Sequence, residues 1–490
     1  MAEKFQLYID GAFCDADDGA VFDSVDPSTG AVWAAMPKAS AADTDRAVRA
    51  AHAAFSAGPW PALTATARGR LLYRLADLVA RDAPIIAELE TRDTGKVIRE
   101  TKAVTGYVAE FYRYFAGLAD KIEGATLPID KLAMEVSTRR EPLGVVAAVV
   151  PWNSQMFLTA TKLAPALAAG NTVVIKASED GPAPLLYFAK LIHEAGLPKG
   201  VVNVITGMGA DCGRVLTSHP LVARVAFTGG PETARHVVRN TAENFAVTTL
   251  ELGGKSPVVV FDDANLDSAL NGVIAGIWGA TGQSCVAGSR LLIHESMHDD
   301  FVARLAKRAG EIKIGPPLDM ATEMGPLATL RQLQRAEKLI AESVAAGAVV
   351  VTGGKARGGA GYYFEPTVLL APSAELPCVR EEFFGPVLSV LKFKTEDEAV
   401  ALANGTDYAF AAGVFTQNLG RAHRLAKSIR AGIVWVNTYR AVSPVAPFGG
   451  NGLTGYGREG GLDAIRDYTR TKSIWINTSD LPMADPFVMR

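Results

Sequence analysis

The sequence predicts an α/β fold in which parallel strands alternate with helices. Between residues 144 and 262, short β-branched segments alternate with helical ones. Gly170 directly follows a helical segment and Pro231 opens another, as expected for a helix end and a first-turn proline. Alternation at this spacing favours a parallel sheet covered by helices on both faces. The expected strands are GVVAAVV (144–150), NTVVIKA (171–177), VVNVIT (201–206) and ARVAFT (223–228).

The chain on either side of this region extends the pattern. Residues 41–120 are predicted to be helical, because apolar residues between Leu71 and Val79 recur three and four positions apart. A second α/β series starts with a helix over about residues 266–278. Its later strands are expected at RLLIH (290–294), VLSVLKF (387–393), AAGVFT (411–416) and GIVWVN (432–437).

Two further segments alternate polar and apolar residues like exposed strands. They are LAMEVSTRR (132–140) and TRTKSIWIN (469–477), and we expect them to pair. Exposed strands so far apart in sequence favour a small sheet that another subunit completes. We therefore divide the chain into three parts: residues 1–124 with 144–252, residues 253–468, and residues 125–143 with 469–490.

The composition is typical of a globular protein with large cores. The 490 residues are 49% hydrophobic and 21% charged, and the net charge of −3 gives no reason to expect nucleic acid or an anionic membrane as a partner. The four cysteines lie far apart without a CxxC pair, which argues against a disulfide framework or a structural zinc site and favours the cytoplasm. We expect neither a signal peptide nor a membrane span.

One metal-like motif is rejected. HESMH (294–298) fits the H-E-x-x-H zinc pattern, which requires both histidines on one face of a helix. Here an apolar, strand-like run precedes the motif and the helical pattern begins near Asp299. His294 and His298 should therefore lie on either side of a turn, and we expect no metal site.

Four stretches at or after expected strand ends carry residues that packing does not require, and ligands bind at such places in open α/β sheets. Cys285 lies in a loop of small and polar residues, where another molecule can approach its thiol. Taken alone, Cys285 could be an inert small residue, Glu251 a surface charge and Asn153 a helix cap. The stretches are GATGQSCVAGSR (279–290), TLELGGKSPVVV (249–260), VVPWNSQ (149–155) and VVIKASE (173–179).

Together with EEFFGPV (381–387) and APFGGNGLTGYGRE (446–459), these stretches resemble six motifs of the NAD(P)-dependent aldehyde dehydrogenase superfamily, in the family's order. The resemblance covers nearly the whole chain. It implies an aldehyde dehydrogenase-like fold with a Rossmann-type NAD-binding domain (1–124 and 144–252), an α/β catalytic domain (253–468) and a small β oligomerisation element (125–143 and 469–490). A homodimer or homotetramer is expected.

The resemblance also implies a reaction, the oxidation of a small-molecule aldehyde to a carboxylic acid with NAD. Cys285 would attack the aldehyde, and Asn153 with the backbone N–H of Cys285 would donate to the oxygen of the thiohemiacetal. Glu251 would activate water to hydrolyse the resulting thioester. A low thiol pKa would allow attack near neutral pH.

Cofactor residues follow from the same resemblance. Lys176 and Glu179 resemble a pair that holds the adenosine ribose, and a carboxylate there repels a 2′-phosphate, which favours NAD over NADP. Glu382 and Phe384 would hold the nicotinamide ribose and ring. Alternatively, Lys176 and Glu179 form a solvated pair and Phe384 belongs to the core. The full expected set is Val150, Pro151, Trp152, Lys176, Glu179, Gly209, Phe227, Thr228, Gly229, Gly230, Leu252, Glu382 and Phe384.

The expected substrate pocket departs from the family pattern. Ser154 and Thr161 replace side chains that are bulky and aromatic in many relatives, which favours a polar or acidic aldehyde of the semialdehyde type. Arg440 could pair with a substrate carboxylate, or could be a surface charge or part of a structural ion pair. The expected pocket residues are Ser154, Phe157, Leu158, Thr161, Arg440 and Phe448.

Two rival functions stay open at this stage. A thiol hydrolase or acyltransferase would use Cys285 without nicotinamide. A CoA-acylating aldehyde dehydrogenase would keep Cys285 but would not need Glu251 to activate water.

Overall fold

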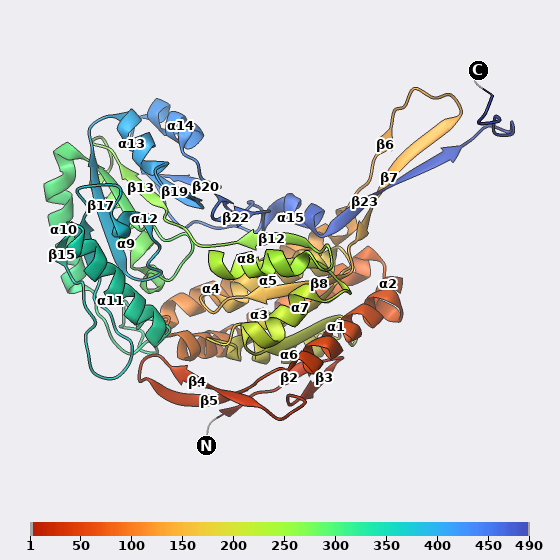
Figure 1. Cartoon of the computed structure of the whole chain (residues 1–490), viewed down its shortest axis with the longest axis horizontal. Helices are drawn as coiled ribbons and strands as arrows, with labels where there is room; N and C mark the ends of the chain where they lie inside the picture. Colours follow the sequence, from red (N-terminus) through yellow and green to blue (C-terminus); the bar gives the residue numbers. More distant parts are fainter. Residues whose placement is uncertain (1–2, 489–490) are drawn as a thin grey trace.

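The computed structural model describes residues 3–488, so the outermost ends of the predicted division, residues 1, 2, 489 and 490, lie outside the described part. Two α/β units lie side by side, and an arm of antiparallel strands projects from one of them (Figure 1). The mixed α/β architecture predicted from the sequence is confirmed.

The first sheet, with strand order β22-β12-β11-β8-β9-β10-β2-β3, has a parallel centre from β12 to β10. The β-branched segments form this centre as expected, and antiparallel strands from both chain ends extend it. The strands are β2 (Leu7–Ile9), β3 (Ala12–Cys14), β8 (Val145–Val150), β9 (Thr172–Ala177), β10 (Val202–Thr206), β11 (Val222–Thr228), β12 (Val247–Glu251) and β22 (Gly455–Tyr456).

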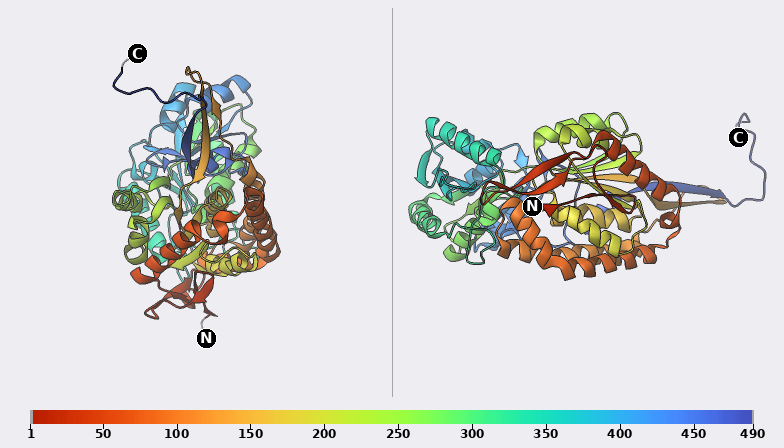
Figure 2. Two further views of the ribbon diagram at one scale, coloured as in Figure 1. Left: turned by 90° about the vertical axis from the view of Figure 1, so that its right-hand side faces the viewer. Right: turned by 90° about the horizontal axis from the view of Figure 1, so that it is seen from below.

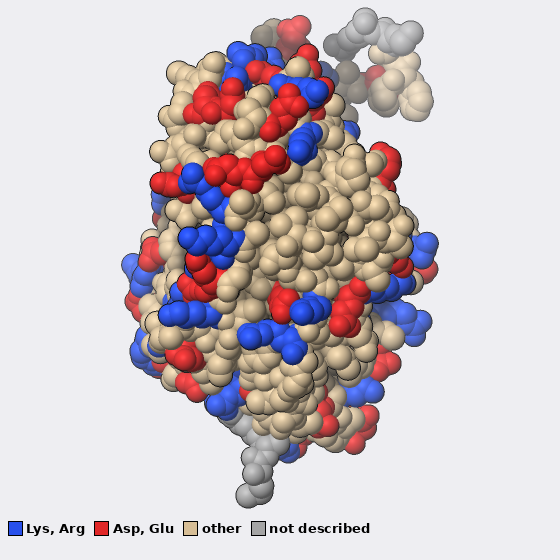
Figure 3. Space-filling view, turned by 90° about the vertical axis from the view of Figure 1, so that its left-hand side faces the viewer, with Lys and Arg blue, Asp and Glu red and all other residues tan. Residues whose placement is uncertain are grey.

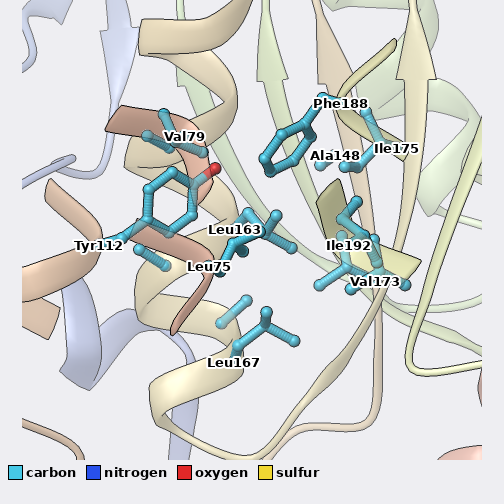
Figure 4. Packing of buried hydrophobic residues seen from close by; sticks show 14 of the residues in the cluster. Leu75, Val79, Tyr112, Ala148, Leu163, Leu167, Val173, Ile175, Phe188 and Ile192 are labelled. Atoms are coloured by element: carbon cyan, nitrogen blue, oxygen red, sulfur yellow. The ribbon is translucent and has the colours of Figure 1, made fainter. Parts of the chain in front are cut away.

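Helices cover both faces of this sheet. Val173 and Ile175 on β9 pack against one helical layer, whereas Val174 between them packs against the other, because successive strand side chains alternate in direction. Figure 4 shows the first of these cores between the helices and β8 and β9. The helices of this unit are α1 (Ala41–Ser56), α2 (Pro59–Ala62), α3 (Ala65–Thr94), α4 (Ile98–Leu118), α5 (Gln155–Ala168), α6 (Ala183–Glu194), α7 (Arg214–Ser218), α8 (Pro231–Thr241) and α15 (Gly461–Asp467).

The predicted helical region 41–120 is divided by local signals. Gly95 ends α3 in the left-handed region (φ 74), where glycine is not strained. The other two predicted boundaries also hold, since α5 ends just before Gly170 (φ 95) and Pro231 is the first residue of α8.

The second sheet, with strand order β15-β16-β17-β14-β13-β19-β20, is parallel except for β15. Its strands are β13 (Pro257–Val260), β14 (Arg290–His294), β15 (Val349–Thr352), β16 (Thr367–Leu370), β17 (Val387–Phe393), β19 (Ala411–Phe415) and β20 (Ile433–Val436). Its helices are α9 (Leu266–Ile277), α10 (His298–Glu311), α11 (Leu330–Ala345), α12 (Pro377–Arg380), α13 (Glu396–Ala403) and α14 (Leu419–Ser428). Acidic and basic side chains lie interspersed over the outer face of this unit (Figure 3).

The chain returns to the first sheet near its end. Tyr456 and Gly455 in β22 pair with Leu250 and Glu251 of β12, and α15 packs on α5. Residues 455–467 therefore pack with the first unit, although they fall inside the predicted part 253–468. The pairing partner of such a short strand is not visible in its sequence.

The predicted pairing of the two exposed segments is confirmed. β23 (Thr469–Asn477) runs antiparallel to β7 (Met134–Pro142), with Thr469 opposite Pro142 and Asn477 opposite Met134. β6 (Thr126–Leu127) adds a third strand. We call this sheet the arm; it extends away from both units (Figure 2) and exposes Trp475 and Ile476.

Smaller features complete the described chain. β1 (Glu3–Lys4), β4 (Val21–Asp26) and β5 (Ala31–Pro37) form a separate sheet, and β18 (Tyr408–Ala409) pairs with β21 (Asn451–Gly452). His294 ends β14 and His298 begins α10, so the two histidines of HESMH do lie on either side of a turn. Within residues 3–488, no cluster of three or more His, Cys, Asp or Glu side chains is arranged to hold a metal, and no helix is long and apolar enough to cross a membrane.

Candidate active site

The carboxyl ends of the parallel strands in the first sheet face a loop from the second unit. β12 ends at Glu251, β11 at Thr228 and β8 just before Asn153, and the facing loop carries Cys285. A cleft of about 760 Å³ lies between them. The predicted residues that line it are Pro151, Trp152, Asn153, Thr228, Gly229, Gly230, Leu252, Cys285, Glu382 and Phe384.

The loop before Cys285 is strained and anchored. Ala280 and Thr281 have φ values of 53° and 55°, a left-handed conformation that costs about 1–2 kcal/mol for each residue with a side chain. The Glu100 carboxylate accepts the N–H of Ala280 at 2.9 Å, and Thr281 Oγ1 donates to the Gly325 carbonyl at 3.2 Å. These contacts hold the loop, so the position of the thiol is set by groups on α4 and in the second unit.

The Cys285 side chain is half-buried at the base of the cleft. Burial, together with the neighbouring Glu251 and Glu382 carboxyls, raises the pKa of its thiol to about 12, although Arg440 opposes them. The low thiol pKa expected from the sequence is therefore not present in this state. The group is a thiol at neutral pH, and its attack on a carbonyl requires removal of a proton.

Asn153 supplies an amide beside the thiol loop. Its Nδ2 donates to the carbonyl of Gln283 at 3.1 Å, which uses one of the two N–H groups of the amide. The residue before α5 is Ser154, whose side chain makes no capping bond to the helix. The structure therefore excludes helix capping by Asn153 and leaves an N–H donor available next to Cys285.

Glu251 is buried without a hydrogen-bond partner. Within the described residues, neither carboxylate oxygen has a partner, and the side chain is 1% exposed. Burial raises the pKa of Glu251 well above its usual value and Glu459 adds to this, whereas Lys162 and Arg458 oppose it. Because its oxygens form no bonds, the carboxyl is free to turn towards the thiol loop. This excludes the alternative that Glu251 is a surface charge.

A buried ion pair lies behind Glu251, and sequence reasoning missed its charged members. Lys162 Nζ pairs with the Glu459 carboxylate and also donates to Thr228 Oγ1 at 2.6 Å. Thr161, expected in the substrate pocket, instead donates from Oγ1 to Glu459 Oε2 at 2.6 Å and is buried. A lysine inside the apolar helical run TATKLAPALAA (159–169) was the signal that could have identified this cluster.

Lys176 and Glu179 form a close pair at the end of β9. Lys176 Nζ lies 2.7 Å from Glu179 Oε2, and Lys176 is buried, so the pair is not simply solvated. Burial favours protonation of Glu179, but the charge and hydrogen bond of Lys176 and the Gly209 amide outweigh it and lower the pKa of Glu179. Lys176, Glu179 and Gly209 lie outside the lining of the cleft, at the neighbouring ends of β9 and β10.

Two expected cofactor residues have side chains in the cores. Val150 packs in the core on one face of the first sheet and Phe227 in the core on the other. A Cβ at Gly229 would lie 2.6 Å from the Phe227 ring, so glycine is needed there for the ring to pack. Neither side chain lines the cleft, because strand residues of a covered sheet point into its two cores.

Glu382 and Phe384 line the cleft from the second unit. Glu382 Oε1 accepts the N–H of Gly254 at 2.8 Å, and burial raises the pKa of Glu382 to about 7 against that bond and the charges of Lys255 and Arg335. Phe384 has a left-handed backbone (φ 53) and meets Trp152 edge to face at 5.5 Å, so it is not a core residue.

Side chains of α11 hold this segment, and sequence reasoning missed them. Gln332 Nε2 donates to the carbonyl of Phe384 at 3.2 Å, and Arg335 Nη2 donates to the carbonyl of Glu382 at 3.1 Å. Both side chains line the cleft. The signal was a polar stripe at positions 331, 335 and 338, which share one helix face.

The expected substrate residues divide between a second cavity and the core. Ser154 and Arg440 line a cavity of about 400 Å³. Phe448 meets Phe157 edge to face at 6.2 Å. Leu158 is buried in the core of the first unit, so it does not form a pocket wall.

Arg440 forms no ion pair with the described residues. Its Nη1 donates to the carbonyl of Ala275 at 3.1 Å, and the side chain is half-buried. The alternative of a structural ion pair is therefore wrong.

The cleft lies at the carboxyl edge of a parallel sheet, where open α/β sheets bind ligands, and a loop from the second α/β unit brings a cysteine to it. The sequence model of the Aldehyde dehydrogenase family matches residues 13–474, and the chain belongs to this family. The predicted family resemblance is confirmed.

Relatives and solved structures agree with this assignment. The chain is 60% identical over 489 residues to (Z)-2-((N-methylformamido)methylene)-5-hydroxybutyrolactone dehydrogenase of Acinetobacter baylyi, with 100% of both chains covered. PnpE from Pseudomonas sp. WBC-3 has a TM-score of 0.95 at 44% identity, covering 99% of this chain and 100% of that one. A Bacillus cereus aldehyde dehydrogenase in complex with NAD+ has a TM-score of 0.95 at 40% identity, covering 97% of each chain.

Proposed function

We propose that this enzyme oxidises an aldehyde to a carboxylic acid with NAD, through a covalent intermediate on Cys285. The observation that supports this most directly is the convergence of three groups from two sheets. Asn153 and Glu251 come from the first sheet and Cys285 from the loop of the second unit. A thiol, an amide donor and an unbonded carboxyl together provide what a thiol-mediated oxidation needs.

Each group has a separate task in the reaction. Cys285 gives up its thiol proton to water as Sγ attacks the aldehyde carbon, and Asn153 Nδ2 with the backbone N–H of Cys285 donates to the oxygen as it gains charge. When bound, NAD would supply the hydride acceptor for this adduct, and Cys285 would then hold the acyl group as a thioester. Glu251 then takes a proton from water, and the resulting hydroxide releases the acid. Because burial and Glu459 raise the pKa of Glu251, this step requires the carboxyl to lose its proton first.

The residues at the edge of the first sheet fit a dinucleotide. A Cβ at Gly230 or at Gly209 would meet no atom within 4 Å, so both backbones are open to a ligand. Gly230 precedes α8, and the free N–H groups of a helix N-terminus suit a phosphate. Glu179 supports NAD over NADP, since an ionised carboxylate repels a 2′-phosphate. Glu382 and the strained Phe384 would hold the nicotinamide side.

We propose an aldehyde that carries a carboxylate as the substrate class. The Acinetobacter baylyi relative is named for a 5-hydroxybutyrolactone. Such a lactone opens to a four-carbon aldehyde acid. In the present chain, Ser154 and Arg440 line a cavity that does not share lining residues with the cofactor cleft. Two polar side chains in this cavity support an acidic rather than a plain alkyl aldehyde.

We propose further that the arm joins subunits into a homodimer or homotetramer, and that the protein works in the cytoplasm. Trp475, Ile476 and Leu127 on the arm are exposed, and β23 is an edge strand, which a second subunit would cover. Free thiols at all four cysteines support a reducing compartment. The NAD-binding, catalytic and oligomerisation roles then fall to the first unit, the second unit and the arm.

The proposal is tested with a panel of aldehydes, following NADH absorbance with NADP in parallel. Oxidation of at least one aldehyde with NAD, and its loss in Cys285→Ser, is the expected result. Turnover of thioesters or esters without any nicotinamide would favour a thiol hydrolase instead. Acid release that depends on added CoA would favour a CoA-acylating enzyme.

A further inference from the structure

The cavity that contains Ser154, which we call the Ser154 cavity, carries an uneven set of charges. Four cationic and two anionic side chains line its volume of about 400 Å³. Lys96 pairs with the buried Glu90 at 2.8 Å, and Arg308 pairs with Glu323 at 2.7 Å. The remaining charged lining residues are Arg99, Glu100 and Arg440.

Of these three residues, Glu100 accepts a hydrogen bond from the thiol loop, and Arg99 is exposed. The Glu100 carboxylate accepts the Ala280 N–H at 2.9 Å and 3.1 Å, one contact to each oxygen, so it serves the thiol loop. Within residues 3–488, neither Arg99 nor Arg440 has a carboxylate within 4 Å. Arg440 is the half-buried one: its Nη1 donates to the Ala275 carbonyl, and the Glu100 carboxylate faces the same space at Gly279. Among the described residues, Nη2 and Nε of Arg440 have no hydrogen-bond acceptor, so they can donate to a ligand.

The position of Arg440 depends on a missing side chain at residue 279. A Cβ at Gly279 would lie 2.5 Å from Arg440 Nη1, although the backbone of Gly279 has no positive φ that would require glycine. Glycine at 279 therefore provides space for the guanidinium. Arg440 itself has a left-handed backbone (φ 62), a conformation that residues with a side chain seldom adopt. Strain of this kind is typical of functional sites.

Arg440 lines the same cavity as Gly279 and Ala280 of the loop that carries Cys285. Its charge acts on Cys285 and opposes the burial that raises the pKa of that thiol. On the other wall, Ser154 accepts a hydrogen bond from Lys96 Nζ at 3.1 Å and directly follows Asn153. The cavity thus borders the thiol loop through Gly279 and Ala280, and the residue after Asn153 lines it as well.

We infer that Arg440, held in the space left by Gly279, is the specificity residue that binds the carboxylate of an aldehyde acid. The inference rests on the proposed function and identifies the group that selects the substrate. A guanidinium offers two parallel N–H donors to a carboxylate, which a lysine cannot match. The cavity volume also exceeds that of an unbranched four-carbon chain, so substrates with a branch next to the carboxylate fit as well.

The test compares 4-oxobutanoate, 5-oxopentanoate and 6-oxohexanoate, each with its methyl ester, which lacks the carboxylate charge. Three chain lengths are used because the distance from the Cys285 thiol to the Arg440 guanidinium decides which aldehyde acid can reach both groups. We expect the acid to exceed its ester in kcat/KM by about 10- to 100-fold at the best length, the usual worth of hydrogen bonds to a charged group. Arg440→Gln should remove this preference and Arg440→Lys should restore part of it. Gly279→Ala should reduce it too, by displacing the guanidinium without removing it.

Arg99→Gln is the matched control, since it removes a cation from the same cavity. A loss of preference equal to that of Arg440→Gln would overturn the inference in favour of a general charge effect. Esters and acids oxidised equally by the wild type would also overturn it, while leaving the proposed function intact. If no aldehyde is oxidised, the proposed function fails, and calorimetry with succinate, glutarate and adipate then tests the inference about Arg440. Binding of a dicarboxylate to the wild type but not to Arg440→Gln supports the inference. Equal binding to both proteins, or no binding to either, overturns it.

Discussion

Replacing Lys162 with Met should destabilise the protein by a predictable amount. Lys162 is fully buried, and its ammonium pairs with Glu459, which is also buried. Met fills a similar volume but removes the charge. The change leaves Glu459 uncompensated beside the buried Glu251 carboxyl and removes the hydrogen bond from Lys162 to Thr228.

The expected magnitude follows from the burial of the pair. Removing one partner of a buried ion pair costs about 3–5 kcal/mol, because the remaining charge has neither bulk water nor a counter-charge. An unfolding entropy of about 2.1 cal/mol/K per residue amounts to about 1 kcal/mol/K for 490 residues that unfold together. The Tm of Lys162→Met should therefore fall by about 3–5 °C.

Thermal unfolding at pH 7 and one fixed scan rate measures this, since large multidomain proteins often unfold irreversibly. Adding Glu459→Gln to Lys162→Met should recover most of the loss, because the stranded carboxylate is then neutral. Lys121→Met is the matched control: Lys121 pairs with Asp120 at 2.6 Å on the surface, and its loss should cost less than about 1 °C. A Lys162→Met protein within 1 °C of the wild type, or a double variant no more stable than the single one, would refute the reasoning.

Three further predictions concern the thiol, the carboxyl and the arm. Since the pKa of Cys285 is raised to about 12, the fraction of thiolate grows about tenfold per pH unit below that value. The rate of iodoacetamide labelling at Cys285, measured as the difference from Cys285→Ser, should therefore rise about tenfold from pH 8 to pH 9. A labelling rate that reaches a plateau below pH 9 would contradict the raised pKa. Glu251→Gln should keep a pre-steady-state burst of NADH while steady turnover falls about 100-fold or more, and equal loss of both phases would argue against water activation. The double substitution Ile474→Lys and Ile476→Lys should reduce the molar mass of the assembly measured by light scattering. An unchanged molar mass would count against assembly through the arm.

Much of the fold was predictable because its strands have strong local signals. β8, β9, β10 and β11 are short β-branched runs, and the pairing of β7 with β23 followed from two alternating segments. β22 was not predictable, because two residues, Gly455 and Tyr456, carry no pattern that identifies a partner strand. The strands before residue 40 were missed as well: β1, β2 and β3 are only two or three residues long, and these strands belong to two different sheets.

The site divides in the same way between local and tertiary signals. Cys285, Glu251 and Asn153 lie in short motifs, so it could be expected that Asn153 and Cys285 line one cleft and that Glu251 lies near enough to act on Cys285. The direction of a side chain from α5 could not, which is why Thr161 was placed in the pocket although it bonds Glu459. The role of Arg440 depends on Gly279, 161 positions earlier in the chain, and a contact of that range has no local signature.

The return of β22 to the first sheet also sets a schedule for folding during synthesis. The parallel centre of that sheet is complete once Glu251 has been made, but the partner of β12 follows only after another 203 residues, at Gly455. At about 5–20 residues per second, β12 remains an open edge for roughly 10–40 s on the ribosome. An unpaired strand of this kind can pair with other nascent chains, and the strand concerned ends in Glu251. Slower translation of the second unit would therefore lengthen the interval in which the chain is prone to aggregate.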